Sequence, residues 1–227
     1  MNFSLIKIKM LTFLIVGSFC ASAQFNLGVQ GSYLNTLTDG NVGHPGFGLF
    51  GEGELDEIVA IQAGFHYYFP SNYSREIQAV ALSPNTSPVL VAIQTKSKIT
   101  LMDFYIGFKY YVVGTHSTFK KESPTAVYVG GDVGVLAAGF ETTTDSTYNI
   151  NWNLYDVPVK DTQLGSFTFL SLNPTIGVEK RISTVYLFSE LKLLVNIVET
   201  SSSGLEFDIP FVVNFNVGVR IPFGGDY

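Results

Sequence analysis

The last long segment of the sequence, Phe211-Val-Val-Asn-Phe-Asn-Val-Gly-Val-Arg-Ile-Pro-Phe223, decides the fold. Its odd-numbered positions are all apolar, whereas its even-numbered positions include Asn214, Asn216, Gly218 and Arg220. Alternation with a period of two predicts a β-strand with one apolar face. The segment has 13 residues, whereas strands of globular proteins centre near about five or six. This length suits a tilted strand that crosses a bilayer, for which roughly 9–11 residues are needed.

Seven further segments show the same alternation, and the period of an α-helix is hard to find anywhere. They cover residues 25–34, 47–55, 59–69, 99–112, 126–140, 168–179 and 185–198. In each of them one face takes aliphatic and aromatic side chains. The opposite face takes glycines, amides and nearly every charge of these segments. Eight such segments predict an antiparallel sheet in which each strand has one apolar and one polar face.

The composition indicates how this sheet meets its surroundings. Hydrophobic residues make up 46% of the chain, charged residues only 14%, and the mean hydropathy is +0.27. So few charges are unusual for a soluble domain. After residue 23, however, no window is long and apolar enough for a transmembrane helix. A closed barrel also satisfies every backbone group within a bilayer. We therefore predict an all-β fold, a closed up-and-down antiparallel transmembrane β-barrel of about eight strands.

The first residues are typical of a secretory signal. Lys7 and Lys9 precede an apolar stretch, and Ala21-Ser22-Ala23 forms a cleavage site. We predict a cleaved signal peptide at 1–23 and a barrel domain at 24–227. Cys20 would leave with the signal, so a disulfide or a cysteine metal site is excluded in the mature chain. Its net charge would be 11 − 19 = −8, which argues against nucleic acid as a partner.

The connections between the predicted strands alternate in length. Long ones lie at 35–46, 70–98, 141–167 and 199–209, and tight ones at 56–58 and 180–184. The connection near 112–125, about a dozen residues long, departs from this rule. With the amino end in the periplasm, the long connections would be extracellular. In the one at 70–98, apolar runs at 77–82 and 89–93 flank Ser83-Pro-Asn-Thr-Ser-Pro88, which predicts a hairpin that extends above the membrane. Pro174 cannot donate to a strand ladder, so we expect a bulge there or a strand that begins nearer Thr175.

The polar face of the strands should line the barrel interior. The predicted lumen network consists of Glu52, Glu54, His66, Asp103, Lys109, Asp132, Glu179, Glu190, Lys192 and Arg220. An eight-stranded barrel is just wide enough to be filled by its own side chains, so we interpret the network as a self-neutralising plug. The excess of acids leaves open a narrow conduit that favours cations.

Aromatic residues near the strand ends are interpreted as interfacial girdles. The residues concerned are Tyr67, Tyr68, Phe69, Tyr110, Tyr111, Phe167 and Phe169.

A search for chemistry finds little. His44 and His116 fall in connections and His66 on a strand, and no pair of histidines has metal-ligand spacing. No nucleophile motif is present either. We therefore predict no catalytic residue, no cofactor and no metal site. A triad built across strands around His66 keeps a lipid-modifying enzyme as a weaker alternative.

The terminal stretch Phe215-Asn-Val-Gly-Val-Arg-Ile-Pro-Phe223 resembles the carboxyl-terminal insertion signal of the small, porin-like outer-membrane β-barrel family. The resemblance extends over 24–223. It implies that Phe215, Val217, Val219, Ile221 and Phe223 are read by the barrel-assembly machinery during insertion. It also implies a location in the outer membrane, with lipids around the wall. The stretch Gly224-Gly-Asp-Tyr227 follows the terminal aromatic, so the match to the signal is imperfect.

These observations favour an integral outer-membrane protein with a structural or surface-interaction role. An extracellular ligand or surface partner would meet the loops at 70–98 and 141–167, because long loops are where such proteins usually act. We expect a monomer. The alternatives are a small pore or uptake protein, the lipid-modifying enzyme, and a soluble lipocalin-like binder whose apolar residues would point inward.

Overall fold

A computed structural model describes residues 25–36, 42–114, 125–144, 151, 153–156, 163–201 and 211–223. The predicted signal peptide, His116 and the residues after Phe223 lie outside these ranges. The described part of the chain contains no helix, and so none that could cross a membrane. Its strands are β1 (Phe25–Thr36), β2 (Gly43–Asp56), β3 (Val59–Ala81), β4 (Leu90–Val113), β5 (Thr125–Thr144), β6 (Tyr155–Asp156), β7 (Gln163–Ile182), β8 (Val185–Ser201) and β9 (Phe211–Phe223).

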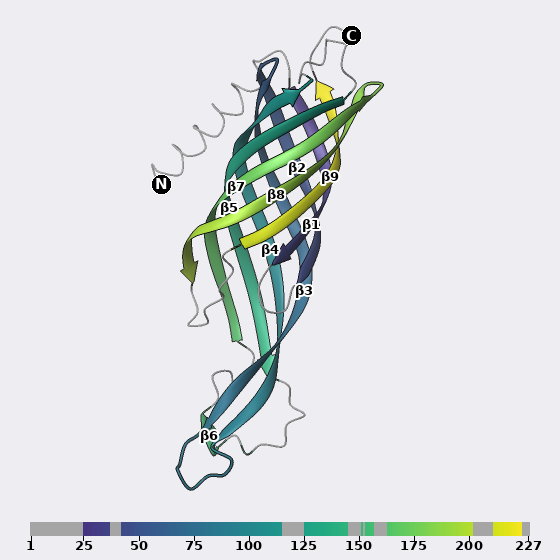
Figure 1. Ribbon diagram of the computed structural model, residues 1–227. Coiled ribbons are helices and arrows are strands. Elements are labelled where there is room, and N and C mark those ends of the chain that lie inside the picture. Colours follow the sequence, from purple (N-terminus) through teal and green to yellow (C-terminus); the bar gives the residue numbers. More distant parts are fainter. Residues whose placement is uncertain are drawn as a thin grey trace, which may run out of the picture.

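Eight of the strands form a closed ring. Each pairs antiparallel with its neighbour in the order β1-β2-β3-β4-β5-β7-β8-β9, and β9 closes the ring by pairing with β1 over the whole of Phe25–Thr36. The predicted up-and-down barrel of eight strands is therefore confirmed. The short β6 is not part of the wall and pairs with the far end of β3 (Figure 1).

The two ends of the barrel differ. At one end, called here the turn end, Phe25 lies opposite both Gly53 and Phe223, and the tight turns at 57–58 and 183–184 connect the strands. At the other, the loop end, β3 and β4 continue well past the rest of the wall (Figure 1). Beyond Tyr68, the last β3 residue that pairs with β2, β3 runs on to Ala81 beside β4. At about 3.3 Å per residue, this run of β3 beyond Tyr68 spans roughly 43 Å. We call this segment, 71–98, the extension. β4 still pairs with β5 along its base, as far as Thr95 opposite Thr144, and only the part beyond is two-stranded.

The extension corrects the bounds of a predicted connection. Residues 70–98 were expected to form a long connection with a hairpin above the membrane. The hairpin is present, but it continues the wall strands: β3 and β4 include most of these residues and leave only 82–89 between them. The alternation is lost at Pro70 because the register of β3 against β4 shifts between Tyr68 and Ser71. After such a shift the side chains change face, so a pattern of period two breaks although the strand continues. The other long connections are also shorter than expected, at 37–42, 145–162 and 202–210.

The expectation at Pro174 was wrong as well. β7 begins at Gln163 and passes through Pro174, which lies opposite Gly131 of β5. The register shift of β7 against β8 lies between Leu170 and Ser171 instead. Pro174 is exposed on the outer wall, and the ladder with β8 has no pair at 173 and 174. The missing N–H of proline is accommodated there without a bulge.

The outer wall is apolar along its length. Leu49, Phe104, Ile106, Phe108 and Val217 point outward, and about half of each side chain is exposed. In water so large an apolar surface would be unfavourable, but against lipid hydrocarbon it is the expected surface of a transmembrane barrel. The inward positions of the same strands carry the buried residues.

Inward glycines make room for inward aromatic rings. The pairs of glycine and ring are Gly28 with Phe50, Gly64 with Tyr105, Gly177 with Tyr128, and Gly218 with Phe188. A Cβ at Gly28 would lie 2.0 Å from the ring of Phe50. That ring is itself held edge-on against Phe188, with centroids 5.4 Å apart. The narrow lumen is thus packed by alternation of small and large side chains.

This packing predicts different effects for two glycines of β1. Gly28→Ala should destabilise the barrel by about 1–3 kcal/mol, because the methyl group overpacks a filled interior. The matched control Gly31→Ala should have little effect, since its nearest neighbour would be the carbonyl oxygen of Val217 at 3.9 Å. Urea unfolding in lipid vesicles measures both. Equal midpoints for the two variants would contradict the packing described here.

Candidate functional site

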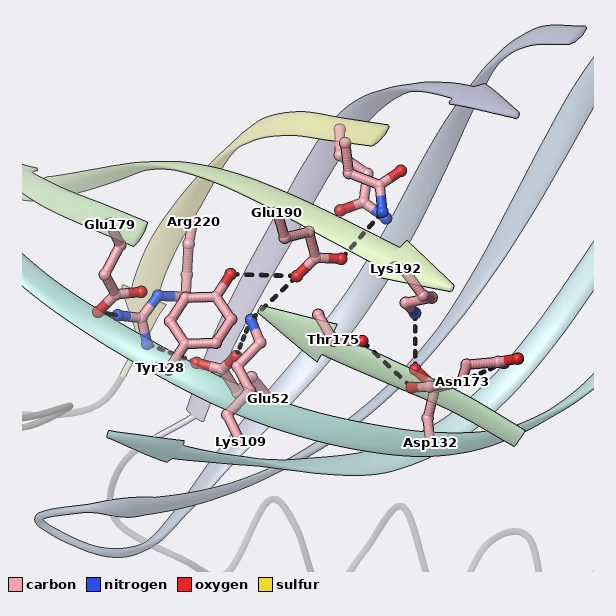
Figure 2. Close-up of polar contacts among 12 residues, drawn as sticks. Glu52, Lys109, Tyr128, Asp132, Asn173, Thr175, Glu179, Glu190, Lys192 and Arg220 are labelled. Carbon is pink, nitrogen blue, oxygen red and sulfur yellow. Dashed lines mark hydrogen bonds and ion pairs between the residues drawn. The ribbon is translucent and has the colours of Figure 1, made fainter. Parts of the chain in front are cut away.

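The turn-end half of the lumen is built around Arg220 of β9. Its Nη1 lies 2.5 Å from Oε1 of Glu52 on β2, and its Nη2 lies 2.7 Å from Oε1 of Glu179 on β7. All three side chains are buried. Figure 2 shows the guanidinium group between the two carboxylates. One cation therefore links three strands of the wall through charge-assisted hydrogen bonds.

Lys109 of β4 extends this network across the lumen. Its Nζ lies 2.8 Å from Oε2 of Glu52 and 4.0 Å from Oε2 of Glu190. Glu190 also accepts hydrogen bonds from the hydroxyl of Tyr128 (3.1 Å) and Nδ2 of Asn216 (2.9 Å). The ammonium group lies 4.7 Å from the centroid of the Tyr128 ring, within the range of a cation–π interaction. Glu190 thus has several partners although it is buried.

A second group of polar contacts lies around Asp132 of β5. Lys192 of β8 reaches its Oδ2 at 2.7 Å, and Nδ2 of Asn173 donates to its Oδ1 at 2.5 Å (Figure 2). Nζ of Lys192 also lies 3.7 Å from the ring centroid of Tyr105. This arrangement combines an ion pair with a cation–π contact in a position without access to water.

His66 forms a third contact group. Its Nδ1 lies 3.1 Å from Oδ2 of Asp103, and its Nε2 contacts the side-chain amide of Gln30. The imidazole stacks with the rings of both Tyr68 and Tyr105. Since His66 and Asp103 are fully buried, a substrate has no direct approach to this pair. In the described ranges, no three His, Cys, Asp or Glu side chains are grouped in a way that could hold a metal ion.

The structure brings nine of the ten predicted lumen residues into the interior, at most 5% exposed. Glu54 is the tenth and is only half-buried near the turn end. The buried acids are Glu52, Asp103, Asp132, Glu179 and Glu190, and the buried bases are Lys109, Lys192 and Arg220, with His66 beside them. Except for Asp103, whose partner is the histidine, each buried acid has at least one buried lysine or arginine within 4.0 Å.

The loop-end half of the lumen holds a large apolar cluster, which the sequence reasoning missed. A cluster of buried side chains fills it, called here the apolar plug: Leu34, Tyr68, Ile99, Leu101, Leu136, Ala138, Phe140, Phe167, Phe169, Leu194 and Val212. Seven of the eight wall strands contribute to it. The predicted interfacial girdle is wrong for four of its members, which are buried and point inward: Tyr68, Tyr111, Phe167 and Phe169. These four residues occupy the same alternating positions of their strands as the lumen charges. That shared alternation could have predicted that they point inward.

Together the two halves close the barrel. A water-filled channel would leave its wall side chains accessible, whereas the charged residues and the plug are almost inaccessible in the described structure. The excess of acids could favour cations only where water and ions can enter. The geometry therefore stabilises the wall and offers no conduit along the described side chains.

The predicted insertion signal lies on the outer face of β9. Phe215, Val217, Ile221 and Phe223 are exposed toward the surroundings of the barrel, and Val219 is partly covered. β9 pairs with β1 on one side and β8 on the other. Recognition of these residues by an assembly machinery stays a prediction.

Fold and interior define the class: the chain is a small transmembrane β-barrel of eight strands with a filled lumen. Comparison with solved structures finds similar chains. Neisserial surface protein A matches with a TM-score of 0.53 at 12% identity, over 88% of this chain and 97% of that chain. Ail, the attachment invasion locus protein of Yersinia pestis, has a TM-score of 0.48 at 11% identity and covers 89% and 99%. The outer membrane protein OprG from Pseudomonas aeruginosa also has 0.48, at 10% identity, over 90% and 98%.

At these identities the likeness concerns the fold. No family model matches the sequence, and no curated protein matches it significantly.

Proposed function

We propose that the chain is an integral outer-membrane protein that acts at the cell surface through the extension, with the lumen as a structural plug. The observation that carries this proposal is the contrast between the two parts. The barrel is closed inside, whereas β3 and β4, at 23 and 24 residues, are about twice as long as the roughly 9–11 residues that cross a bilayer.

The location follows from the same physical features. An apolar outer wall requires a membrane, and β-barrels that cross with strands are the solution used in outer membranes. Tight turns lie at one end and the extension at the other, as expected when the turn end faces the periplasm. An export signal at 1–23, outside the described residues, would supply the route.

The connection between β5 and β7 takes part in the surface structure. β6, between β5 and β7, pairs with the end of β3 through Val80 opposite Asp156 and Ala81 opposite Tyr155. The two regions that the sequence indicated as sites for an extracellular partner, 70–98 and 141–167, therefore meet at the tip of the extension. A single composite surface is better suited to a partner than two separate loops.

Surface labelling tests the orientation. In a cysteine-free background made by Cys20→Ser, Asn85→Cys in the exposed turn 82–89 should react with a large membrane-impermeant maleimide on intact cells. The matched control Thr184→Cys, in the exposed turn 183–184, should react only after the outer membrane is opened. The opposite labelling pattern would refute the proposed orientation.

A shortened chain tests whether the surface role depends on the extension and not on the barrel. Asn72 and Lys98 are paired across the extension, so an Asn-Gly turn that joins them should preserve the register. The shortened protein should retain the mobility difference between heated and unheated samples that marks a folded barrel. Clumping of cells that carry the full-length chain should be lost with the shortened one. Equal clumping would argue against a role for the extension.

The excess of buried acids is the one observation that favours the alternative of a pore. The filled lumen counts against it. The enzyme alternative depended on His66, and the burial of His66 beside Asp103 and Gln30 offers it no support.

A further inference from the structure

One edge of β3 has no neighbouring strand along the middle of the extension. The pairing of β3 with β2 ends at Tyr68, and its pairing with β6 begins at Val80. Between these two residues, β3 pairs with β4 alone among the strands that the structure describes. Figure 1 shows β3 crossing the distance from the barrel wall to β6. We call the free side of residues 72–79 the open edge.

Two hydrogen bonds at the tip show which backbone groups point to this edge. The N–H of Ala81 donates to the oxygen of Val89, toward β4, at 2.8 Å. The N–H of Leu82 donates to the oxygen of Leu154, on the side of β6, at 2.9 Å. Backbone groups of a strand alternate in direction from one residue to the next. Even-numbered residues of the extension of β3 therefore direct their N–H and C=O groups to the open edge, and odd-numbered residues direct theirs to β4.

Three even-numbered residues form the centre of the open edge: Ser74, Glu76 and Gln78. Their side chains are exposed, and no hydrogen bond of their backbone on this side is found in the described ranges. Unpaired N–H and C=O groups at every second residue of an exposed strand are a template for one more strand. The open edge therefore offers a specific chemistry, the complement of an extended backbone.

The chain itself shows that this side of β3 accepts strands. β2 pairs with β3 as far as Tyr68, and β6 pairs with it at Val80 and Ala81, both in the antiparallel direction. The hydroxyl of Ser71 donates to the carbonyl oxygen of Gly43 at 2.8 Å, so the start of β2 still contacts β3 just below the open edge. At about 3.3 Å per residue, residues 72–79 leave roughly 26 Å between the two neighbours, which is room for one extended segment.

The side chains of β3 indicate which segment fits. On one face, Ile77 and Ala79 pack in a small apolar cluster. On the other face, Glu76 and Gln78 are polar and exposed. Side chains of an added strand lie beside those of β3 on the same two faces. The fitting segment therefore alternates, with apolar residues on the face of Ile77 and polar residues on the other, including a lysine or arginine beside Glu76.

We propose that the open edge is a β-augmentation site, at which an extended segment of another protein adds to the sheet as a strand antiparallel to β3. Main-chain hydrogen bonds give such a complex its affinity, and alternate side chains give its specificity. Two copies of the chain in one membrane present β3 in the same direction, so their open edges could pair only in parallel. All strand pairs of this sheet are antiparallel. The inference rests on the proposed function and names the kind of partner that the extension binds.

Hydrogen exchange of the free protein tests whether the edge is open. In the protein in lipid nanodiscs, the amides of Ser74, Glu76 and Gln78 should exchange fast, because their N–H groups point away from β4. The amides of Ile77 and Ala79, which point to β4, should be protected. NMR spectroscopy resolves the exchange of single amides. If the even-numbered amides were as protected as the odd-numbered ones, the chain would cover the edge itself, and the proposal would be overturned.

A synthetic peptide tests the addition of a strand. The probe is a short fluorescent peptide in which valine alternates with threonine and lysine, and fluorescence anisotropy measures its binding to the protein in nanodiscs. Gln78→Pro removes an N–H from the open edge and leaves the ladder with β4 intact, so it should weaken binding at least about tenfold. The matched control Gln78→Ala keeps the backbone N–H and should bind within about twofold of the unchanged protein. The bound peptide should also protect the amides of Ser74 and Glu76.

The failures of the two proposals can be distinguished. The heat-dependent gel shift shows that both variants of Gln78 are folded. Absence of binding, or equal binding by Gln78→Pro, would refute the open edge as a site for an added strand. If Asn85→Cys still reacts with the impermeant maleimide on intact cells, the surface role stands without this inference. If Asn85→Cys reacts only in opened cells, the proposed function fails, whereas binding of the peptide in nanodiscs would still support a strand-accepting edge.

Discussion

Replacing Arg220 with alanine is expected to destabilise the barrel by about 3–5 kcal/mol, the usual cost of removing one partner from a buried ion pair. The guanidinium group contacts Glu52 and Glu179 within 2.7 Å, and all three residues are buried. Without it, Glu179 loses the buried cation 2.7 Å from its Oε1, while Lys109 stays 2.8 Å from Oε2 of Glu52. Urea unfolding in lipid vesicles, followed by the heat-dependent gel shift, measures the loss.

Two variants make this prediction specific to charge. Arg181→Ala removes an arginine at the turn end that is partly exposed, and it should cost little because exposed charges contribute little to stability. In the double variant Arg220→Ala with Glu179→Gln, one unpaired carboxylate is gone, so part of the stability should return. If the double variant were less stable than Arg220→Ala alone, uncompensated charge would not be the cause.

The wall of the barrel could be predicted from the sequence because one physical rule acts along every strand. β9 alternates from Phe211 to Phe223, and the structure places its odd-numbered apolar residues outward and Asn214, Asn216 and Arg220 inward. The lumen charges followed from the same rule, since a charge in a lipid-facing position would be costly. The pairing of individual acids and bases could not be predicted, because the partners lie on different strands. The sequence of one strand does not determine its register against the next.

The apolar plug was missed because alternation carries less information when both faces are apolar. Leu193 and Leu194 are adjacent on β8, yet one is exposed and the other is buried in the plug. Nothing in their side chains distinguishes them. Only the parity shared with Glu190 and Lys192 places Leu194 inside. The hairpin of the extension was predicted, but its continuity with the wall strands was missed, since the register shift after Tyr68 changes the parity within one strand.

The division of the lumen has a physical consequence. The polar half links β2, β4, β5, β7, β8 and β9 by directional contacts that specify the register of the strands. The apolar half adds non-directional burial at the end from which the extension projects. A filled, rigid barrel can hold a surface structure at a fixed height, which an open, water-filled barrel of the same size would do less well.

The adjacent leucines of β8 provide the sharpest test of the plug. Leu194→Ala should destabilise the barrel by about 2–5 kcal/mol, because it removes a buried side chain and leaves a cavity among rigid neighbours. Leu194 is fully buried and lies opposite Val212, another plug residue. Leu193→Ala should cost much less, because lipid chains fill the space on the outer wall. Both variants keep the same backbone, charge and strand position.

Unfolding midpoints in vesicles compare the two variants directly. Phe169→Ala, at another plug position, should resemble Leu194→Ala, because its ring is also buried and packs edge-on against Phe167 with centroids 5.0 Å apart. If Leu193→Ala were the more damaging change, the inward and outward faces of β8 would be exchanged, and the assignment of both the plug and the lumen network would fail with it. A large effect at Leu194 and Phe169 alone would mean that the interior beneath the loop end is packed as tightly as a soluble core. The extension would then project from a rigid part of the barrel.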